Sequence, residues 1–327
     1  MSIEIINPGM LTTIQDKGRF GFQKSGIGQA GAMDQEAYSA ANKLVGNMLN
    51  EAVLEMTMLG AALKFTDDAL CALTGADMEA KLDGENVATY AAFYVKAGQK
   101  LTLGYAKNGM RSYLAVQGGI DVPKVLGSRS TDIKSGLGGY EGRALKKGDV
   151  LAVTEHEDLP PIYKTLPKPD FPMDLEIRVI LGPQDDYFTD KGIAAFLGAA
   201  YSVTPQSDRM GIRLDGAAVE NKAGVDIVSD GITFGSVQIP ASGTPIIMMA
   251  DHQTAGGYAK IATVVSKDLA KLAQAQPGCK IHFKKTSLQE MQLVPVESLL
   301  KKVDALPPPP KEKSKGMWGM LKEMLGL

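Results

Sequence analysis

Between positions 54 and 153 the chain is a series of short β-prone runs, separated by turn residues and with no helical pattern between them. Asp83-Gly84 and Asn108-Gly109 within this stretch have the composition of hairpin turns. Strands at this spacing favour antiparallel sheets or a barrel over a parallel doubly wound sheet. We therefore expect a mainly β fold with a few helices. The predicted strands of this stretch are residues 69–73, 87–90, 101–103, 112–116 and 150–153.

A proline-rich stretch divides the chain. At 327 residues one hydrophobic core is improbable, and two packed domains are the default expectation. Four prolines fall within residues 159–169, where they stiffen the backbone and block sheet pairing. We predict a β-rich domain over 1–158, a linker over 159–171, a second β-rich domain over 172–300, and a proline-rich spacer with a short amphipathic tail over 301–327.

Helices are few in both predicted domains. Asp34 is the predicted N-cap of a helix that places Ala37, Tyr38, Ala41 and Leu44 on one face. The second domain has a strand at 175–181, a helix at 190–197, an apolar strand at 245–250, a helix at 267–274 capped by Ser266, and a last strand at 280–284.

The richest polar chemistry lies between Ser207 and Tyr258. The apolar strand at 245–250 runs directly into Asp251-His252-Gln253-Thr254 and a Gly-Gly pair. A buried strand that ends in polar residues aims them from a rigid support into a cleft. His252 is thus a candidate general acid or base, or a residue that orients the substrate; the alternative is a histidine satisfied by structural hydrogen bonds.

Several arginines stand where lysine would serve solubility equally well. The planar guanidinium suits carboxylates and phosphates, and it is also the usual choice for buried ion pairs. Each arginine is therefore either half of a structural salt bridge or part of a cleft that binds an anionic ligand. Asp16 and Asp208 are candidate carboxylates for proton transfer or for contact with a metal-bound nucleotide, with pairing to arginine as the alternative. The candidate arginines are Arg19, Arg111, Arg143, Arg209 and Arg213.

Composition and motifs exclude several classes of function. A net charge of -2 gives no electrostatic basis for binding nucleic acid. Cys71 and Cys279 belong to no metal-binding spacing, and free thiols are expected in a reducing cytoplasm. No segment approaches the roughly 20 apolar residues of a membrane span, so a membrane location is not expected. The glycine-rich loops match neither the P-loop nor the dinucleotide fingerprint, and the Met-Lys-Met context of covalently bound biotin is missing.

The chain contains the phrase Ser207-Asp208-Arg209-Met210-Gly211-Ile212-Arg213-Leu214. This phrase and many others, in order along the chain, resemble the carboxyltransferase-domain family known as allophanate hydrolase subunit 2, which includes KipA-like proteins and the C subunits of bacterial 5-oxoprolinases. The resemblance covers nearly all of residues 3–285 and leaves out the tail. The other matching phrases lie at 8–19, 31–34, 41–47, 73–77, 109–120, 126–132, 138–145, 182–185 and 251–258.

This resemblance implies a cyclophilin-like β-barrel in the second domain and an enzyme that works only as part of a complex. The implied partners are a KipI-like protein and a LamB/YcsF-like protein. The implied reaction uses ATP, with Mg²⁺ shared with the partners, to open 5-oxo-L-proline to L-glutamate. Catalytic residues are then sought among Asp208, Arg209, Arg213, His252, Gln253 and Thr254, and substrate- or nucleotide-binding residues among Asp16, Arg19, Arg111 and Arg143. No metal ligands are predicted.

Two other functions remain open within the same family. One is a biotin-dependent carboxyltransferase component that acts on urea or a related amide, with biotin held by a separate carrier. The other is a non-catalytic protein that sequesters a KipI-like partner. For the tail, which places Met317, Leu321, Met324 and Leu325 at helical spacing, the alternatives are docking on its own protein, on a partner subunit, or on a membrane surface.

Overall fold

The computed structural model describes residues 1–155, 165–222 and 226–292. Met1–Lys285 form one compact unit, and the residues from Thr286 onward form another, whose described part includes helix α4 (Leu288–Gln292). The predicted tail at 301–327, the end of the predicted second domain at 293–300 and residues 159–164 of the predicted linker lie outside the described residues.

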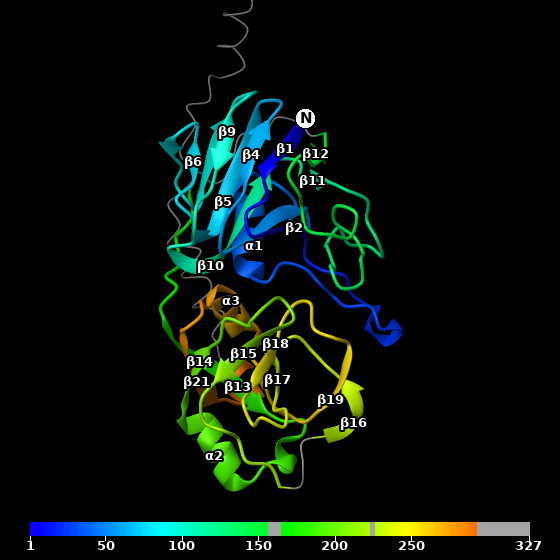
Figure 1. Ribbon diagram of the computed structural model, residues 1–327, viewed down its shortest axis with the longest axis vertical. Helices are drawn as coiled ribbons and strands as arrows, with labels where there is room; N and C mark the ends of the chain where they lie inside the picture. The colour runs from blue at the N-terminus through cyan, green and yellow to red at the C-terminus, as the bar shows by residue number, and fades with distance from the viewer. Residues whose placement is uncertain (156–164, 223–225, 293–327) are drawn as a thin grey trace, which may run out of the picture. The chain divides into compact units, whose positions relative to one another are not determined.

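The first half of the chain builds two antiparallel sheets (Figure 1). The order of the larger sheet is β11 (Ile120–Asp121), β12 (Val150–Val153), β1 (Ser2–Asn7), β4 (Ala62–Phe65), β9 (Lys100–Thr102), β6 (Lys81–Leu82) and β7 (Glu85–Asn86). The order of the smaller sheet is β2 (Leu11–Gln15), β3 (Val53–Thr57), β10 (Asn108–Val116), β5 (Ala69–Asp77) and β8 (Ala91–Val95).

Alternation along the strands explains how these sheets pack. Leu54 and Met56 of β3 point into a core shared with Ile3, Ile5 and other residues of the larger sheet, whereas Val53 belongs to a second cluster on the opposite face. Helix α1 (Gln35–Leu44) covers that second face. The smaller sheet is therefore buried on both sides, which accounts for the uninterrupted apolar character of its central strands.

The second half closes into a seven-stranded barrel, as expected. Its order is β13 (Asp174–Leu181), β20 (Lys260–Val264), β17 (Ser236–Gln238), β18 (Ile246–Met248), β15 (Gly211–Asp215), β14 (Ala200–Val203) and β21 (Lys280–Lys285). A separate hairpin pairs β16 (Asp226–Gly231) with β19 (Ala255–Tyr258). The prediction of a mainly β chain with few helices and a barrel in its second half is confirmed.

The helices of the second half cover the barrel and connect it to the first half. Helix α2 (Asp190–Gly198) packs on β21, where the rings of Phe196 and Phe283 stack with centroids 4.3 Å apart. Helix α3 (Ser266–Gln274) contacts both β13 of the barrel and β10 of the smaller sheet (Figure 1). Two short 3-10 turns, η1 (Gln23–Ser25) and η2 (Asp185–Tyr187), complete the described elements.

Of the two predicted helix caps, one is confirmed and the other is wrong. Asp34 caps α1 as predicted, because its side chain accepts hydrogen bonds from the backbone N–H groups of Glu36 and Ala37. The cap of α3 is Val265 rather than Ser266, and no side chain accepts a hydrogen bond there. Ser266 is instead the first helical residue.

Two β predictions in the first half are wrong. Residues 87–90 form no strand, because the backbone turns at Tyr90, which has φ +57°, before β8 begins. Asn108-Gly109 is not a hairpin turn but the start of β10, where the pairing with β5 shifts register. The ring of Phe171 and the amide oxygen of Gln274 fill the space beside Gly109, which also has φ +82°, so a glycine is needed there. Asp83-Gly84 does connect the hairpin of β6 and β7.

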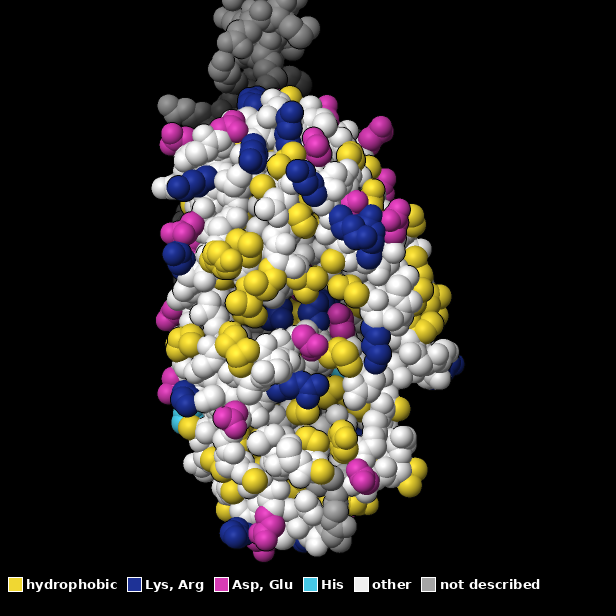
Figure 2. Space-filling model, viewed as in Figure 1, with side chains coloured by type: hydrophobic (Ala, Val, Ile, Leu, Met, Phe, Trp, Pro, Cys, Tyr) yellow, Lys and Arg dark blue, Asp and Glu magenta, His cyan; other side chains and the backbone are white. Residues whose placement is uncertain are grey.

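Among the described residues, no helix is long and apolar enough to span a membrane. Figure 2 shows Lys/Arg and Asp/Glu side chains interspersed over the face in view, so that this face carries no large patch of one charge.

Candidate functional site

Arg209 is the centre of a buried ion-pair network between the two halves of the first unit. Its side chain is 5% exposed. The guanidinium binds Asp251 through two hydrogen bonds of 2.8 Å, from Nε and Nη2. Nη1 donates to Glu55, and Nη2 also donates to the carbonyl oxygen of Gly31 at 2.7 Å. Asp251 belongs to the barrel, whereas Glu55 and Gly31 belong to the first half, so one side chain joins both halves.

Glu55 is the residue of this network that the sequence analysis missed. It is the one charged residue of the buried strand β3, and its side chain is 1% exposed. Oε2 accepts the backbone N–H of Met33 at 2.8 Å, which leaves Oε1 to Arg209. A lone acid in a strand that is buried on both faces requires a cationic partner, and that was the available signal.

Arg111 and Gln274 extend the network toward α3. Arg111 is 5% exposed, lies 3.9 Å from Glu55, and donates from Nη1 to the carbonyl of Ala273 at 2.5 Å. The side-chain oxygen of Gln274 accepts the backbone N–H groups of Met110 and Arg111, both at 2.9 Å. Its amide nitrogen donates to Asp34 at 2.8 Å. Gln274 thus provides hydrogen-bond partners both to the backbone of β10 and to Asp34, the cap of α1.

Burial and opposite charge act against each other in this network. Burial alone lowers the pKa of Arg209, but the carboxylates of Asp251 and Glu55 outweigh it, so that the pKa is raised. Burial lowers the pKa of Arg111, with Glu55 opposing the shift. The contacts of Arg209 occupy its guanidinium on three sides. Its role in this structure is therefore to hold other groups in place.

Asp16 fastens the loops next to this network. Its Oδ1 accepts hydrogen bonds from Gly18 N at 2.8 Å, Ser128 Oγ at 2.7 Å and Ser130 Oγ at 2.5 Å, and its Oδ2 accepts Arg129 N at 2.6 Å. A carboxylate with this many donors is fully engaged in joining the loop after β2 to residues 128–130.

Arg19 is held by the same loops but keeps one donor free. It is fully buried. Nε donates to the carbonyl of Val125 and Nη2 to that of Ser130, both at 3.0 Å. Within the described residues, Nη1 is buried and has no hydrogen-bond partner. Burial lowers the pKa of Arg19, and the nearby carboxylates of Asp132, Asp16 and Asp251 oppose that shift.

The glycine-rich loop at 136–142 closes over Arg19. A Cβ at Gly138 would overlap the carbonyl of Ser130 and lie 2.7 Å from Nη2 of Arg19, and one at Gly139 would overlap Thr131. Both glycines have positive φ, +65° and +54°. The space beside these glycines is thus filled by the chain's own atoms, which accounts for the glycines through packing.

His252 also has an unpartnered ring nitrogen. The residue is 2% exposed, and Nδ1 lies 2.7 Å from the carbonyl oxygen of Gln253. Because that oxygen can only accept, the proton is on Nδ1 and Nε2 carries the lone pair. Burial lowers the pKa of His252, which keeps the ring neutral. Among the described residues, Nε2 is buried without a partner.

Gly28 lies next to Asp132 and to the backbone of His252. A Cβ on Gly28 would lie 3.4 Å from Oδ2 of Asp132 and 3.8 Å from the carbonyl oxygen of His252. Asp132 is 5% exposed and also influences the pKa of both Arg19 and Asp251. We call Arg19, Gly28, Asp132 and His252 the polar corner. A guanidinium donor and a neutral imidazole base are the kinds of group that stabilising an oxyanion and activating a water molecule require.

The remaining predicted residues are placed differently. Gln253 and Thr254 follow His252 and are partly exposed. Asp208 is exposed and accepts the backbone N–H groups of Met210 and Gly211, so it shapes the turn before β15. Arg143 lies in the first half, where it pairs with Asp149 at 2.7 Å and with Glu141 at 2.9 Å. Arg213 is exposed on β15 and is outside the polar corner.

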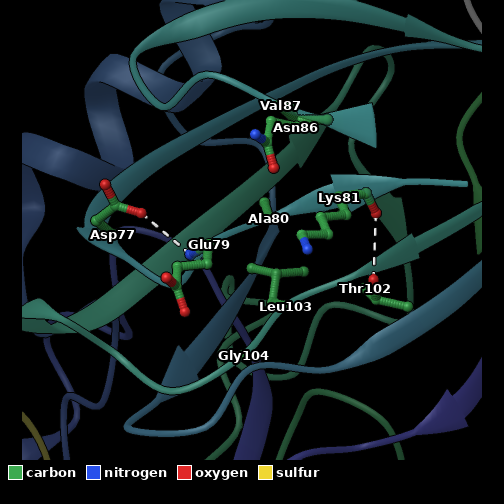
Figure 3. Close-up of a pocket in the computed structure, with 9 residues that line it drawn as sticks. All are labelled: Asp77, Glu79, Ala80, Lys81, Asn86, Val87, Thr102, Leu103 and Gly104. Carbon is green, nitrogen blue, oxygen red and sulfur yellow. Dashed lines mark hydrogen bonds between the residues drawn. The ribbon is translucent and has the colours of Figure 1, made fainter. Parts of the chain in front are cut away.

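A separate hollow of about 720 Å³ lies in the first half, next to β6 and β9 (Figure 3). Figure 3 shows Asp77 and Glu79 on one side, with Lys81 and Asn86 extending from the other. Both acids already have surface partners: Asp77 lies 3.0 Å from Lys168, and Glu79 lies 3.5 Å from Lys107. In the part of the chain that is described, no three His, Cys, Asp or Glu residues are arranged to hold a metal ion.

Comparison with known proteins identifies relatives that span most of this chain. It is 43% identical over 292 residues to the C subunit of the Escherichia coli 5-oxoprolinase, a match that covers 88% of this chain and 92% of that protein. The protein of the same name from Haemophilus influenzae is 41% identical over 288 residues, and the match covers the same shares.

A solved structure of the Kluyveromyces lactis urea amidolyase superimposes with a TM-score of 0.84 at 30% identity. It covers 93% of this chain, but this chain spans only 20% of that larger protein. The model of the family described as "Carboxyltransferase domain, subdomain A and B" matches residues 25–285. The chain therefore belongs to this carboxyltransferase-domain family, as its sequence phrases indicated.

Proposed function

We propose that this chain is the C-type subunit of an ATP-dependent 5-oxoprolinase, which opens 5-oxo-L-proline to L-glutamate. The observation that carries the proposal is the similarity to the Escherichia coli 5-oxoprolinase protein over 92% of the length of that protein. In this function the chain acts in the cytoplasm, together with a KipI-like and a LamB/YcsF-like protein.

The chemistry of such a reaction is consistent with the groups of the polar corner. Transfer of the γ-phosphoryl group of ATP to the lactam oxygen releases ADP and makes the ring carbon electrophilic. Water then adds to that carbon, and collapse of the adduct breaks the ring C–N bond and leaves the γ-acyl phosphate of glutamate. A second water molecule hydrolyses this acyl phosphate to L-glutamate and phosphate. The steps need a base for the water and donors for the negatively charged oxygens.

The residues of this chain supply one group for each of these needs. Nε2 of His252 is the unprotonated base, and Nη1 of Arg19 is the donor for an anionic oxygen. Arg209, Asp251 and Asp16 position these groups through their own saturated contacts. The nucleotide, with its Mg²⁺, would be held mainly by the partner subunits, because the loop at 136–142 is packed by this chain's own atoms.

Reconstitution with the two partner proteins tests the proposal. Glutamate release from 5-oxo-L-proline should require ATP and this chain, and His252→Gln should lower the rate at least about 100-fold, the usual contribution of a general base. His282→Gln, which changes a half-buried histidine on β21, is the matched control and should retain the rate. Full activity without this chain would refute the proposal.

A second function is favoured by the likeness to the urea amidolyase structure. In that case the chain would move a carboxyl group from a biotin on a separate carrier protein to urea or a related amide. Supplying carboxylated biotin carrier and urea to the same preparation distinguishes the two functions. Partner binding without either activity would instead favour the non-catalytic antagonist of a KipI-like protein.

A further inference from the structure

A hollow of about 530 Å³ on the barrel contains chemistry that the polar corner does not use. Three segments line it: the turn between β14 and β15, the second half of β15, and the loop between β17 and β18. Proline residues in two of these segments, Pro205 and Pro240, stiffen its walls. None of the residues of the polar corner lines this hollow.

Arg213 is the cationic group of this hollow. On β15 the neighbouring Ile212 and Leu214 point into the barrel core, so Arg213 faces outward. Its backbone is fixed, since its N–H binds Ser207 Oγ at 3.0 Å and its carbonyl accepts the N–H of Thr204 at 2.9 Å. Among the described residues, its guanidinium has neither an ion pair nor a hydrogen bond. Such a guanidinium is available to an external anion.

Asp215 provides the opposite charge on the same face. It lies two residues after Arg213 on β15, so the two side chains project from the strand in the same direction, roughly 7 Å apart along it. Within the described ranges, no ion pair joins them. Both line the hollow, and a ligand that lies between them would meet a cation at one end and a carboxylate at the other.

Hydroxyl groups also line the hollow. Ser242 and Thr244 face each other with 3.0 Å between their oxygens. Thr204 also lines the hollow.

We propose that this hollow is a binding site for an α-amino acid, held as its zwitterion. Arg213 binds the carboxylate, Asp215 binds the ammonium group, and the hydroxyls of Thr204, Ser242 and Thr244 complete the hydrogen bonds. A phosphate or a simple carboxylate would satisfy Arg213 but would be repelled by Asp215. The arrangement therefore selects a ligand with both charges.

The choice of amino acid rests on the proposed function. L-glutamate, the product, has a free ammonium group, whereas the nitrogen of 5-oxo-L-proline is part of a neutral lactam. The site should consequently bind the product and not the substrate. Binding there would report the concentration of product to the complex from outside the polar corner.

Isothermal titration of the full chain, without ATP or partner proteins, tests this site. The probes are L-glutamate, glutarate, which is the same diacid without the ammonium group, and 5-oxo-L-proline. We expect L-glutamate to bind about tenfold more tightly than either of the others. Arg213→Gln should weaken the binding of L-glutamate about tenfold or more. In Asp215→Asn, the affinity for L-glutamate should fall to the affinity for glutarate.

The control Lys191→Gln removes one positive charge from exposed α2 and should leave the affinity unchanged. Equal affinities of the parent for L-glutamate and glutarate, or an Asp215→Asn variant that still prefers L-glutamate about tenfold, would refute selection of a zwitterion. Unchanged binding by Arg213→Gln, or no binding of L-glutamate, would refute the site. Because these titrations need no enzymatic turnover, their failure is distinct from a failure of the reconstitution.

Discussion

Arg209 and Arg213 lie four residues apart and have opposite environments. The guanidinium of Arg209 is 5% exposed and is bound by Asp251, Glu55 and Gly31. The side chain of Arg213 is exposed and, in the described residues, unpartnered. The first arginine precedes β15, where the chain meets the first half, whereas the second points outward from the strand itself.

The difference shows that residue type and motif do not determine the role of an arginine in this chain. Removing one partner from a buried ion pair strands a charge in a medium that cannot solvate it, so Arg209 should matter for stability. Replacing a solvated side chain that has no ion pair or hydrogen bond should barely change stability and should affect only the binding of a ligand. Substitutions at buried and exposed positions test this contrast, from the largest expected effect to the smallest.

The largest effect should follow Arg209→Met. It leaves the carboxylates of Glu55 and Asp251 buried without their cation, and we expect the free energy of unfolding to fall by about 4 kcal/mol. Urea denaturation monitored by circular dichroism measures this change. A loss below about 1 kcal/mol would show that the network is solvated and would remove the contrast with Arg213.

Gln274→Ala should have the next largest effect. It removes the acceptor of two buried backbone N–H groups and the donor to Asp34, which should cost about 2 to 3 kcal/mol. The matched control is Gln206→Ala on the rim of the barrel hollow, which should stay within about 0.5 kcal/mol of the parent. Equal effects of the two changes would contradict the role of Gln274.

His252 should give the fold a smaller, pH-dependent contribution. Burial lowers the pKa of His252, so the unfolded chain takes up its proton first as the pH falls. The stability that this residue contributes is therefore present above about pH 6.5 and is lost as the pH drops below it. The fall in unfolding free energy between about pH 7 and 5 should be shallower in His252→Gln than in the parent. His282→Gln should leave the slope unchanged, and an identical slope in both variants would contradict the shift.

The smallest effect should follow Arg213→Gln. Since its guanidinium makes no contact among the described residues, the unfolding free energy should change by less than about 0.5 kcal/mol. Differential scanning calorimetry checks this, with Arg209→Met in the same experiment. A loss of more than about 1 kcal/mol would mean that Arg213 has a structural partner in the folded chain.

Much of the fold was predictable because it follows from local patterns. Alternating and continuous apolar runs, turn pairs such as Asp83-Gly84 and the cap at Asp34 depend on short-range physics. Asn108-Gly109 was misassigned because its glycine is required by two side chains that are distant in the sequence, those of Phe171 and Gln274. Residues 87–90 failed because a positive φ at Tyr90 cannot be deduced from composition.

The candidate site was less predictable for the same reason. The sequence singled out Arg209, Arg19 and His252, but it could not show that the first is saturated while the other two keep unpartnered atoms. That outcome depends on Glu55, Asp132 and Ser130, each far from its partner in the sequence. Burial and partner geometry are properties of the assembled fold, whereas propensity and motif are properties of the chain.

The position of Gln274 sets an order of events during synthesis. The N–H groups of Met110 and Arg111, inside a sheet that consists only of residues before position 117, obtain their acceptor from a helix translated more than 160 residues later. In a ribosome-bound chain that ends before α3, the central strand β10 would therefore lack the acceptor for these two N–H groups. Maturation of that half must wait for the last helix of the barrel to leave the exit tunnel.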